Sequence, residues 1–338
     1  MPANFEYTAL RNTKIITRSP QTRLGVIFSL ELIIRPLRKE DLPEADRIMR
    51  LAFGTFLGVP EPERFGEGMD HVKGRWLADP TSAFGAEIDG RLVGSNFAAK
   101  LGSFGYFGPL TVHPDFWDRG VAKRLLELTM ELFAKWEVRS IGLFTFAHSP
   151  KHLGLYQKFG FWPRSLTLLM SKTADANDPS PGGLEFSKVT ERDQRTILNR
   201  CRRLTDSVYE GLDLEREILS VRKQELGETI LIQDAGRVVG LAICHCGAGT
   251  EAGKDTCYVK FGVANSETAF DTLLDAVQGL AVEKGLTAIL AGVNMACVKA
   301  AKKTFARGFR TDFQGAWMLR PNEPALDKFD SFVICDLR

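Results

Sequence analysis

The stretch from residue 112 to residue 127, VHPDFWDRGVAKRLLE, combines the residue types that hold a phosphate group. An apolar run ends at Val112, a short loop carries Arg119 and Gly120, and the pattern that follows predicts an amphipathic helix. The first turn of a helix has unpaired N–H groups and a partial positive charge, so phosphate binds there readily. Glycine has no Cβ and lets the backbone come close to such a ligand. The stretch therefore predicts a pyrophosphate-binding loop.

Other residues of this loop support the prediction. Val121 begins the apolar face of the predicted helix, and Ala122 keeps the next position small. Lys123 and Arg124 add long-range attraction for further phosphate groups. The loop differs from the P-loop of nucleotide-binding proteins, because the sequence has no GxxxxGK[ST] pattern.

The elements around the loop occur twice along the chain. GRLVGSNFA (90–98) matches GRVVGLAIC (236–244), and GFWPRSLTLLMSK (160–172) aligns with GFRTDFQGAWMLR (308–320). This repetition predicts two similar α+β units in tandem. The counterpart of the phosphate loop, VANSETA (263–269), is shorter and has neither a glycine nor a basic residue. The loop is therefore not needed to build the fold, which favours a functional role.

The predicted elements set the limits of the two units. Strands are expected at 32–37, 83–89, 91–100, 105–112, 139–146 and 164–172, and helices at 42–53 (capped by Asp41), 121–136 and 150–160. Residues 32–173 form the first unit, 174–183 a linker rich in turn formers, and 184–338 the second unit. Residues 1–31 are basic and lack periodicity, so we expect a disordered extension, a targeting leader or an over-long gene start outside the fold.

Two motifs of the first unit resemble the GNAT superfamily, the acyl-CoA-dependent N-acyltransferases. The first is a strand ending in V-x-P, then Q/R-x-x-G-x-G/A and a helix, and it stands here at residues 112–122. The second is L-Y-x-K-x-G-F, at residues 155–161. Trp117 replaces the usual Gln or Arg of the first motif, and Ser149 stands where many members have Asn. The second unit resembles the same fold with a degraded CoA loop.

The resemblance implies an α+β fold of two tandem GNAT-like domains, each a mixed, mostly antiparallel twisted sheet flanked by helices. It implies that acetyl-CoA is the co-substrate and that an amine attacks it directly, without an acyl-enzyme. The implied cofactor-binding residues are Thr111, Val112, Arg119, Gly120, Val121, Ala122, Lys123 and Ser149. Tyr156 is the candidate acid for the leaving thiolate. The aligned residue of the second domain is Thr304, which has no phenol.

The sequence leaves the general base open. An alkyl ammonium must lose its proton before it attacks, and many relatives use a strand carboxylate for this through a water molecule. The strand predicted at 105–112 contains no carboxylate. Glu87, His71, Tyr106 and His148 remain candidates, and each also has a structural interpretation.

The expected reaction is transfer of an acetyl group from acetyl-CoA to an amine of a small molecule or peptide. The first domain is expected to be catalytic, and the second to be structural or to shape the substrate site. Phe53, Phe56 and Phe65 either belong to the core or line an apolar acceptor pocket. The alternative is a non-catalytic acetyl-CoA sensor or a protein-interaction module.

Composition excludes several other classes of function. The formal net charge is +2 without a basic stripe, which argues against nucleic-acid binding, and no apolar run approaches the roughly 20 residues of a membrane span. All six cysteines lie in the second half without a preceding secretory signal, so we expect free thiols and a cytoplasmic location. Cys244 and Cys246 are too close together for a usual zinc pair, and we expect no metal. The chain is expected to be a monomer or a homodimer.

Overall fold

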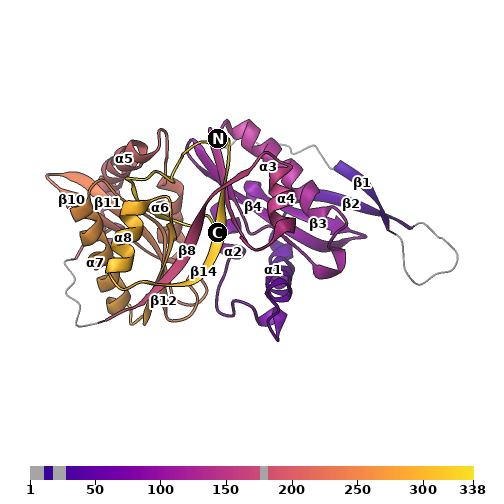
Figure 1. Ribbon diagram of the computed structural model, residues 1–338, viewed down its shortest axis with the longest axis horizontal. Helices are drawn as coiled ribbons and strands as arrows, with labels where there is room; N and C mark the ends of the chain where they lie inside the picture. The colour runs from indigo at the N-terminus through magenta and orange to yellow at the C-terminus, as the bar shows by residue number, and fades with distance from the viewer. Residues whose placement is uncertain (1–10, 18–27, 176–181) are drawn as a thin grey trace.

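The computed structural model describes residues 11–17, 28–175 and 182–338. They form two α+β halves side by side, with strands β8 (Trp162–Thr173) and β14 (Arg310–Arg320) between them (Figure 1). From the β3–β4 and β10–β11 hairpins onward, strands and helices follow in the same order in both halves. This confirms the predicted fold class of two tandem domains.

The elements are as follows. The first half contains β1 (Arg11–Thr17), β2 (Phe28–Pro36), α1 (Leu42–Leu57), α2 (Lys73–Ala78), β3 (Ala83–Ile88), β4 (Arg91–Leu101), β5 (Phe104–Phe107), β6 (Thr111–Val112), α3 (Val121–Trp136), β7 (Ser140–Thr145), α4 (Pro150–Gln157) and β8. The second half contains β9 (Leu184–Glu185), α5 (Glu191–Val208), α6 (Glu215–Gln224), β10 (Gly227–Asp234), β11 (Arg237–Cys246), β12 (Thr256–Ala264), α7 (Glu267–Glu283), β13 (Ala288–Asn294), α8 (Val298–Ala306), β14 and β15 (Phe332–Cys335).

The two halves share one sheet and exchange a strand. The strand order is β1-β2-β3-β4-β5-β7-β14-β8-β13-β12-β11-β10-β9, and β6 and β15 pair with β4 and β12. The sequence predicted that residues 164–172 close the first half, but β8 pairs with β13 and β14 instead, while β14 pairs with β7. Thr167 lies opposite Gly315, its aligned residue in the repeat. The pseudo-twofold axis therefore passes between these two residues.

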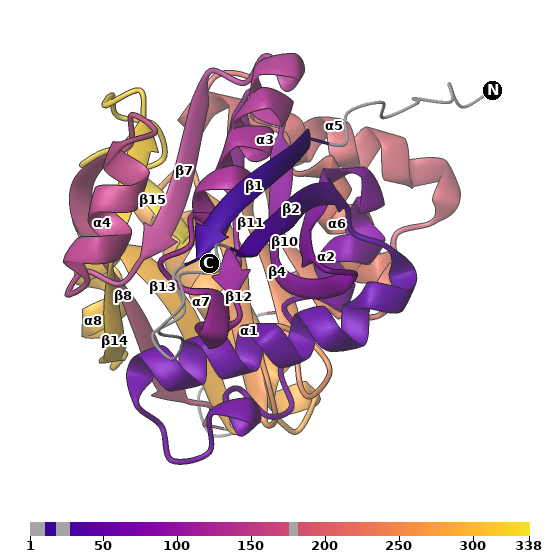
Figure 2. The same ribbon diagram turned by 90° about the vertical axis from the view of Figure 1, so that its right-hand side faces the viewer.

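Two apolar cores cover the two faces of the sheet in the first half. Helices α3 and α4 pack on one face, against side chains such as Ile34 and Phe84. Helix α1 packs on the other face, against Leu37 and Phe97. In Figure 2, α1 lies apart from α3. Alternate strand residues point to opposite faces, so neighbouring residues such as Phe97 and Ala98 join different cores.

Part of the segment that was expected outside the fold belongs to the sheet. Residues 11–17 form β1, which pairs antiparallel with β2 so that Arg11 lies opposite Ile34. The segment RNTKIIT is rich in β-branched residues and extends the sheet at the open edge of β2. Residues 1–10 and 18–27 of this segment, and residues 176–181 of the predicted linker, lie outside the described residues.

Two local predictions differ from the structure. The strand predicted at 105–112 is broken into β5 and β6 around Pro109, which has no N–H to donate to a neighbouring strand. Asp41 does not cap α1 with its side chain; its carboxylate instead accepts hydrogen bonds from Arg35, at 2.6 Å, and from the Arg38 N–H, at 2.8 Å. A buried arginine is a stronger partner for a carboxylate than a helix N–H, since both groups are charged.

We predict that Gly315→Ala destabilises both halves together. A Cβ on Gly315 would lie 2.7 Å from the carbonyl oxygen of Thr145 and against the ring of Phe144, where β14 crosses β7. Overpacking of this kind costs about 2 kcal/mol of unfolding free energy, which urea unfolding measures. Gly154→Ala is the control, because a Cβ there meets no atom within 4 Å. Two separate unfolding transitions, with only one of them shifted, would contradict the shared sheet.

Candidate active site

The sheet of the first half opens into a wedge beside β6. β5 pairs in parallel with β7 as far as Tyr106, which lies opposite Gly142. After the break at Gly108, β6 pairs only with β4, through Thr111 opposite Ser95. In the described part of the chain, no strand covers β7 on this side beyond Gly142. The backbone of β6 thus faces an opening between two diverging strands.

The N-terminus of α3 lies at the end of this wedge and has no cap. Gly120 precedes the helix with φ +79°, a conformation that favours glycine, and no side chain caps the first turn. The first helical hydrogen bond of α3 runs from the Arg124 N–H to the carbonyl of Gly120. The N–H groups of Val121, Ala122 and Lys123 therefore precede the hydrogen-bonded ladder. A Cβ on Gly120 would meet no protein atom within 4 Å, so the approach to these amides is open.

The side chains of the loop frame this helix end. Arg119 lies over the ring of Phe116, with 5.1 Å from its guanidinium carbon to the ring centre. Lys123 is exposed and lies 3.9 Å from Glu127. Trp117, the departure from the family motif, donates its indole N–H to the carbonyl of Val112 at 2.7 Å. The tryptophan therefore fixes the loop against the end of β6.

Ser149 directly precedes α4 as its N-cap residue, and Tyr156 lies within that helix. The Ser149 hydroxyl caps α4 by accepting the N–H of His152 at 3.3 Å, so this side chain has a structural role. The Tyr156 ring is buried next to Phe107, and its hydroxyl lies near the side chain of Thr145, at the end of β7. Burial raises the pKa of Tyr156, so the phenol keeps its proton at neutral pH.

In the second half the equivalent wedge and helix end are both closed. β12 pairs with β13 as far as Val259, opposite Ala291, and then pairs with β15, from Phe261 opposite Cys335. β15 thus occupies the place that is open beside β6. The hydroxyl of Ser266 caps α7 by accepting the N–H of Ala269 at 3.2 Å. The aligned Thr304 is buried and donates to the carbonyl of Ala300.

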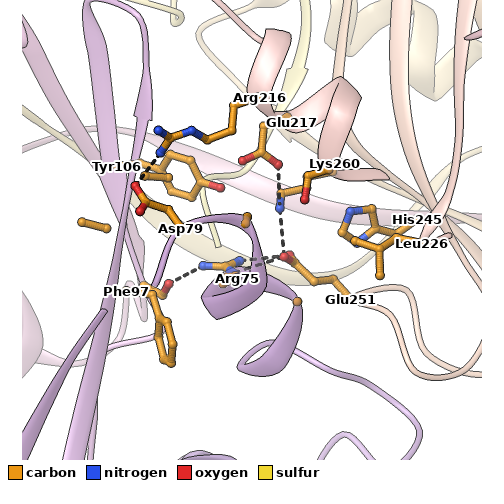
Figure 3. Close-up of a pocket in the computed structure, with 16 residues that line it drawn as sticks. Arg75, Asp79, Phe97, Tyr106, Arg216, Glu217, Leu226, His245, Glu251 and Lys260 are labelled. Carbon is orange, nitrogen blue, oxygen red and sulfur yellow. Dashed lines mark hydrogen bonds and ion pairs between the residues drawn. The ribbon is translucent and has the colours of Figure 1, made fainter. Parts of the chain in front are cut away.

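A buried cluster of charged side chains joins the two halves next to the wedge (Figure 3). Arg75 of α2 donates to both carboxylate oxygens of Glu251, at 3.1 and 2.9 Å. It also donates to the carbonyl of Gly108, at the strand break. Lys260 of β12 bridges Glu251 and Glu217, with both distances 3.0 Å. The cluster therefore connects α2 and the strand break of the first half to α6 and β12 of the second.

The charges in this cluster stabilise one another. Burial alone would raise the pKa of Glu251, but Arg75 and Lys260 hold it well below its usual 4.5. Burial alone would lower the pKa of Lys260, but Glu217 and Glu251 together raise it. Burial and the nearby Lys260 lower the pKa of His245 to about 3, so this imidazole is neutral. Glu251 and Lys260 therefore stay ionised because oppositely charged partners lie beside them.

The structure brings two of the four candidate bases into this cluster. His71 lies 3.8 Å from Glu251, and burial lowers its pKa. Tyr106 is buried beside Arg75, at 5.9 Å from ring centre to guanidinium carbon. Glu87 lies elsewhere and pairs with Arg35 at 2.7 Å. His148 is exposed and stacks on Phe56.

The three phenylalanines that were expected in a core or an acceptor pocket form a half-buried aromatic cluster. Phe53 contacts Phe65 and Phe146, with ring centres 5.9 Å apart in both pairs. The ring centres of Phe56 and Phe146 are 4.5 Å apart, and Phe146 is the residue directly after β7. The cluster therefore packs the end of α1 against the chain that follows β7, and Phe53 also packs against the core that contains Leu37 and Phe97.

No sequence pattern indicated the residues that the second half contributes to the charged cluster around Arg75. Glu217, Glu251 and Lys260 belong to no motif, and they approach Arg75 only because of the strand exchange. The only related observation in the sequence was that residues 105–112, where many relatives carry a catalytic carboxylate, contain none. The six cysteines are free thiols, as predicted. Among the described residues, no group of three or more side chains forms a metal site.

We predict that Glu251→Gln destabilises the protein at about pH 7 by roughly 3 kcal/mol, because it leaves Arg75 and Lys260 without their shared carboxylate. The pKa of Glu251 is depressed in the folded state, so its contribution is present above pH 4.5 and is lost as the pH falls below that value. The difference in unfolding free energy between wild type and variant should therefore shrink in acid. Glu210→Gln, at an exposed pair with Arg139, is the control and should change stability little. A pH-independent difference would contradict the assigned charges.

Comparison with known proteins supports the assignment of the first half. Residues 46–161 match the acetyltransferase (GNAT) family. A proposed acetyltransferase from Pyrococcus horikoshii has a similar structure, with TM-score 0.66 and 16% identity over 90% of this chain and 95% of that one. A GCN5-related N-acetyltransferase from Sphaerobacter thermophilus gives TM-score 0.54 and 18% identity over 88% and 98%. No curated protein matched the sequence.

These likenesses support an N-acyltransferase as the class of enzyme. No helix among residues 11–17, 28–175 and 182–338 is long and apolar enough to cross a membrane. The fold repeats across the two halves, while the family match covers only the first. Residues 46–161 therefore belong to the GNAT acetyltransferase family, and the fold of this first half is repeated in the second.

Proposed function

We propose that the first half binds acetyl-CoA and that the protein transfers its acetyl group to an amine of a small molecule or peptide. One observation carries this proposal: the first half has an open wedge beside an uncapped helix end, and the second half has both features closed. The same fold therefore offers one acyl-CoA site per chain. The second half has a different task, which is to complete the acceptor side of that site.

The residues around the wedge fit the chemistry of acyl-CoA. The N–H groups of Val121, Ala122 and Lys123 would hold the pyrophosphate, with Arg119 adding positive charge. The free edge of Thr111 and Val112 would pair with the pantetheine amides. Bound acyl-CoA supplies an activated thioester carbonyl for the amine to attack. Ser149 acts on this site indirectly, because its hydroxyl caps α4.

Tyr156 is our candidate for the acid that gives a proton to the leaving sulfur. Its hydroxyl lies near Thr145 at the end of β7, beyond the last β5–β7 pair at Gly142. The raised pKa keeps the phenol protonated until the thiolate forms. The second half has the hydroxyl of Thr304 at the aligned position, which is bonded to its own helix and is too weak an acid for this role.

The acceptor would enter from the face that carries α1 and α2. This face presents the aromatic cluster of Phe53, Phe56 and Phe65 and leads to the charged junction with the second half. We expect the protein to act in the cytoplasm, as a monomer or homodimer, without metal or nucleic acid. A non-catalytic acetyl-CoA sensor would share the cofactor site and would differ in showing no amine-dependent release of CoA.

We predict that calorimetric titration with acetyl-CoA gives one site per chain and that Gly120→Glu abolishes it. A carboxylate on Gly120 would point into the open approach to the α3 amides and repel the phosphates. Gly236→Glu is a matched control, because Gly236 also has a positive φ and open space around it, on the hairpin between β10 and β11. Normal binding by Gly120→Glu would refute the proposed loop, and two sites would mean that the second half also binds.

We predict that Tyr156→Phe lowers kcat about a hundredfold and leaves acetyl-CoA affinity nearly unchanged, because the change removes only an acid. Release of CoA in the presence of primary amines measures kcat, and calorimetry measures the affinity. Tyr209→Phe is the control, since it removes a hydroxyl that bonds to Ser140, away from the wedge. If turnover is unchanged, Tyr156 only packs beneath the cofactor. If neither protein releases CoA with any amine while acetyl-CoA binds, the sensor alternative is favoured.

A further inference from the structure

Residues 336–338 leave the second half and pack against the first. They follow β15, and in Figure 1 the chain end marked C lies between the two halves. The side chain of Leu337 is 4% exposed and lies directly on the backbone of Gly142, because a Cβ on that glycine would be 2.4 Å from the Leu337 Cδ1 atom. Gly142, opposite Tyr106, is also the last residue of β7 that pairs with β5. Leu337 therefore lies at the vertex of the wedge, where the two strands begin to diverge.

Apolar side chains close this vertex on both faces of the sheet. Phe104 lies beside Leu337, since the same Cβ on Gly142 would be 2.8 Å from the Phe104 Cζ atom. On the other face, Phe107 packs against Tyr156 with 5.9 Å between the ring centres. The cavity next to Leu337 has a volume of about 20 Å³, which is room for about one water-sized group. A ligand that enters the wedge therefore meets a wall at its narrow end.

The phosphate groups and the acyl group of a bound acyl-CoA would lie at opposite ends of the wedge. The bare amides of α3 follow β6 at the open end, and Gly142 marks the narrow end. With its pyrophosphate on those amides and its pantetheine along Thr111 and Val112, acyl-CoA would extend its thioester toward the vertex. The far end of the acyl group would then meet Leu337.

We propose that Leu337 limits the acyl group to acetyl and thereby sets the acyl specificity of the protein. The inference rests on the proposed acyl-CoA site, and it makes a side chain of the second half part of that site. An acetyl group ends in a single methyl, whereas each further methylene would have to displace Leu337 or Phe104. Close-packed apolar side chains resist the insertion of even one methylene.

The contacts of the neighbouring residues hold Leu337 in place. Asp336 accepts hydrogen bonds from the hydroxyl of Tyr258 at 2.8 Å and from the N–H of Arg338 at 3.1 Å. The backbone oxygen of Arg338 accepts from Arg75, whose guanidinium also donates to the carbonyl at the strand break. Leu337 itself has φ +56°, a conformation that leucine rarely adopts, so these contacts determine its backbone. The wall therefore cannot move aside for a longer chain without breaking hydrogen bonds on both sides of it.

Binding of acyl-CoA in the absence of an acceptor tests this wall. Calorimetry should show that wild-type protein binds acetyl-CoA about tenfold more tightly than hexanoyl-CoA, the effect of overpacking by the longer chain. Leu337→Ala opens the vertex, so hexanoyl-CoA should then bind at least as tightly as acetyl-CoA. Phe104→Leu reduces the same wall from β5 and should shift the preference in the same direction.

Leu280→Ala is the matched control. Leu280 is also 4% exposed, and it lies on α7 of the second half. This variant loses the same number of buried carbons as Leu337→Ala and should keep the wild-type preference for acetyl-CoA. Coenzyme A without an acyl group should bind wild type and the three variants with the same affinity, which also reports that they are folded. If Leu337→Ala does not bind coenzyme A, Phe104→Leu decides the question.

The possible outcomes separate the two proposals. If wild type binds hexanoyl-CoA as tightly as acetyl-CoA, the wall is wrong and the acyl-CoA site stands. The wall is also wrong if the preference survives in Leu337→Ala and Phe104→Leu, or if Leu280→Ala loses it as well. If wild type binds neither coenzyme A nor its two acyl forms, the acyl-CoA site itself is wrong.

Discussion

The exchange of β8 and β14 is the constraint on which the rest of the structure depends. Because each half receives its neighbouring central strand from the other, the halves cannot pivot without breaking the hydrogen bonds of the shared sheet. This fixed orientation brings α6 and β12 against α2 and the strand break at Gly108. Only in that arrangement do Arg75, Glu251, Lys260 and Glu217 form one buried network, whose charges would otherwise be too costly to remove from water.

Within this symmetrical frame the two halves use the same features differently. The wedge between diverging strands is open beside β6 and filled by β15 beside β12. The helix that follows begins with bare amides at Gly120 in one half and with a serine cap at Ser266 in the other. The first half is therefore the one that we propose binds acyl-CoA, while the second half supplies Glu217, Glu251 and Lys260 to the charged cluster at the junction. The two copies of the fold therefore differ at equivalent positions, and we assign them different roles.

Features that are local in sequence were predictable, and features that depend on distant contacts were not. The repeat, the α3 helix and the loop at 112–127 follow from periodicity and glycine placement over short windows. The partner of β8 was not predictable, because an apolar strand has the same pattern beside either β7 or β13. Glu217 and Lys260 resemble ordinary charged residues until the strand exchange buries them. The break at Gly108 lies within an apolar run that predicts one continuous strand.

The strand exchange also affects how the protein is made. β7 is complete once residue 145 has been synthesised, but its partner β14 ends only at residue 320. During translation the first half therefore carries an unpaired central strand, with exposed N–H and C=O groups, until nearly the whole chain has left the ribosome. An unpaired strand edge of this kind can pair with other chains. The first domain therefore completes its sheet only after β14 of the second domain has been synthesised. Because both halves lie in one polypeptide, the strand that completes the first half is always synthesised with it.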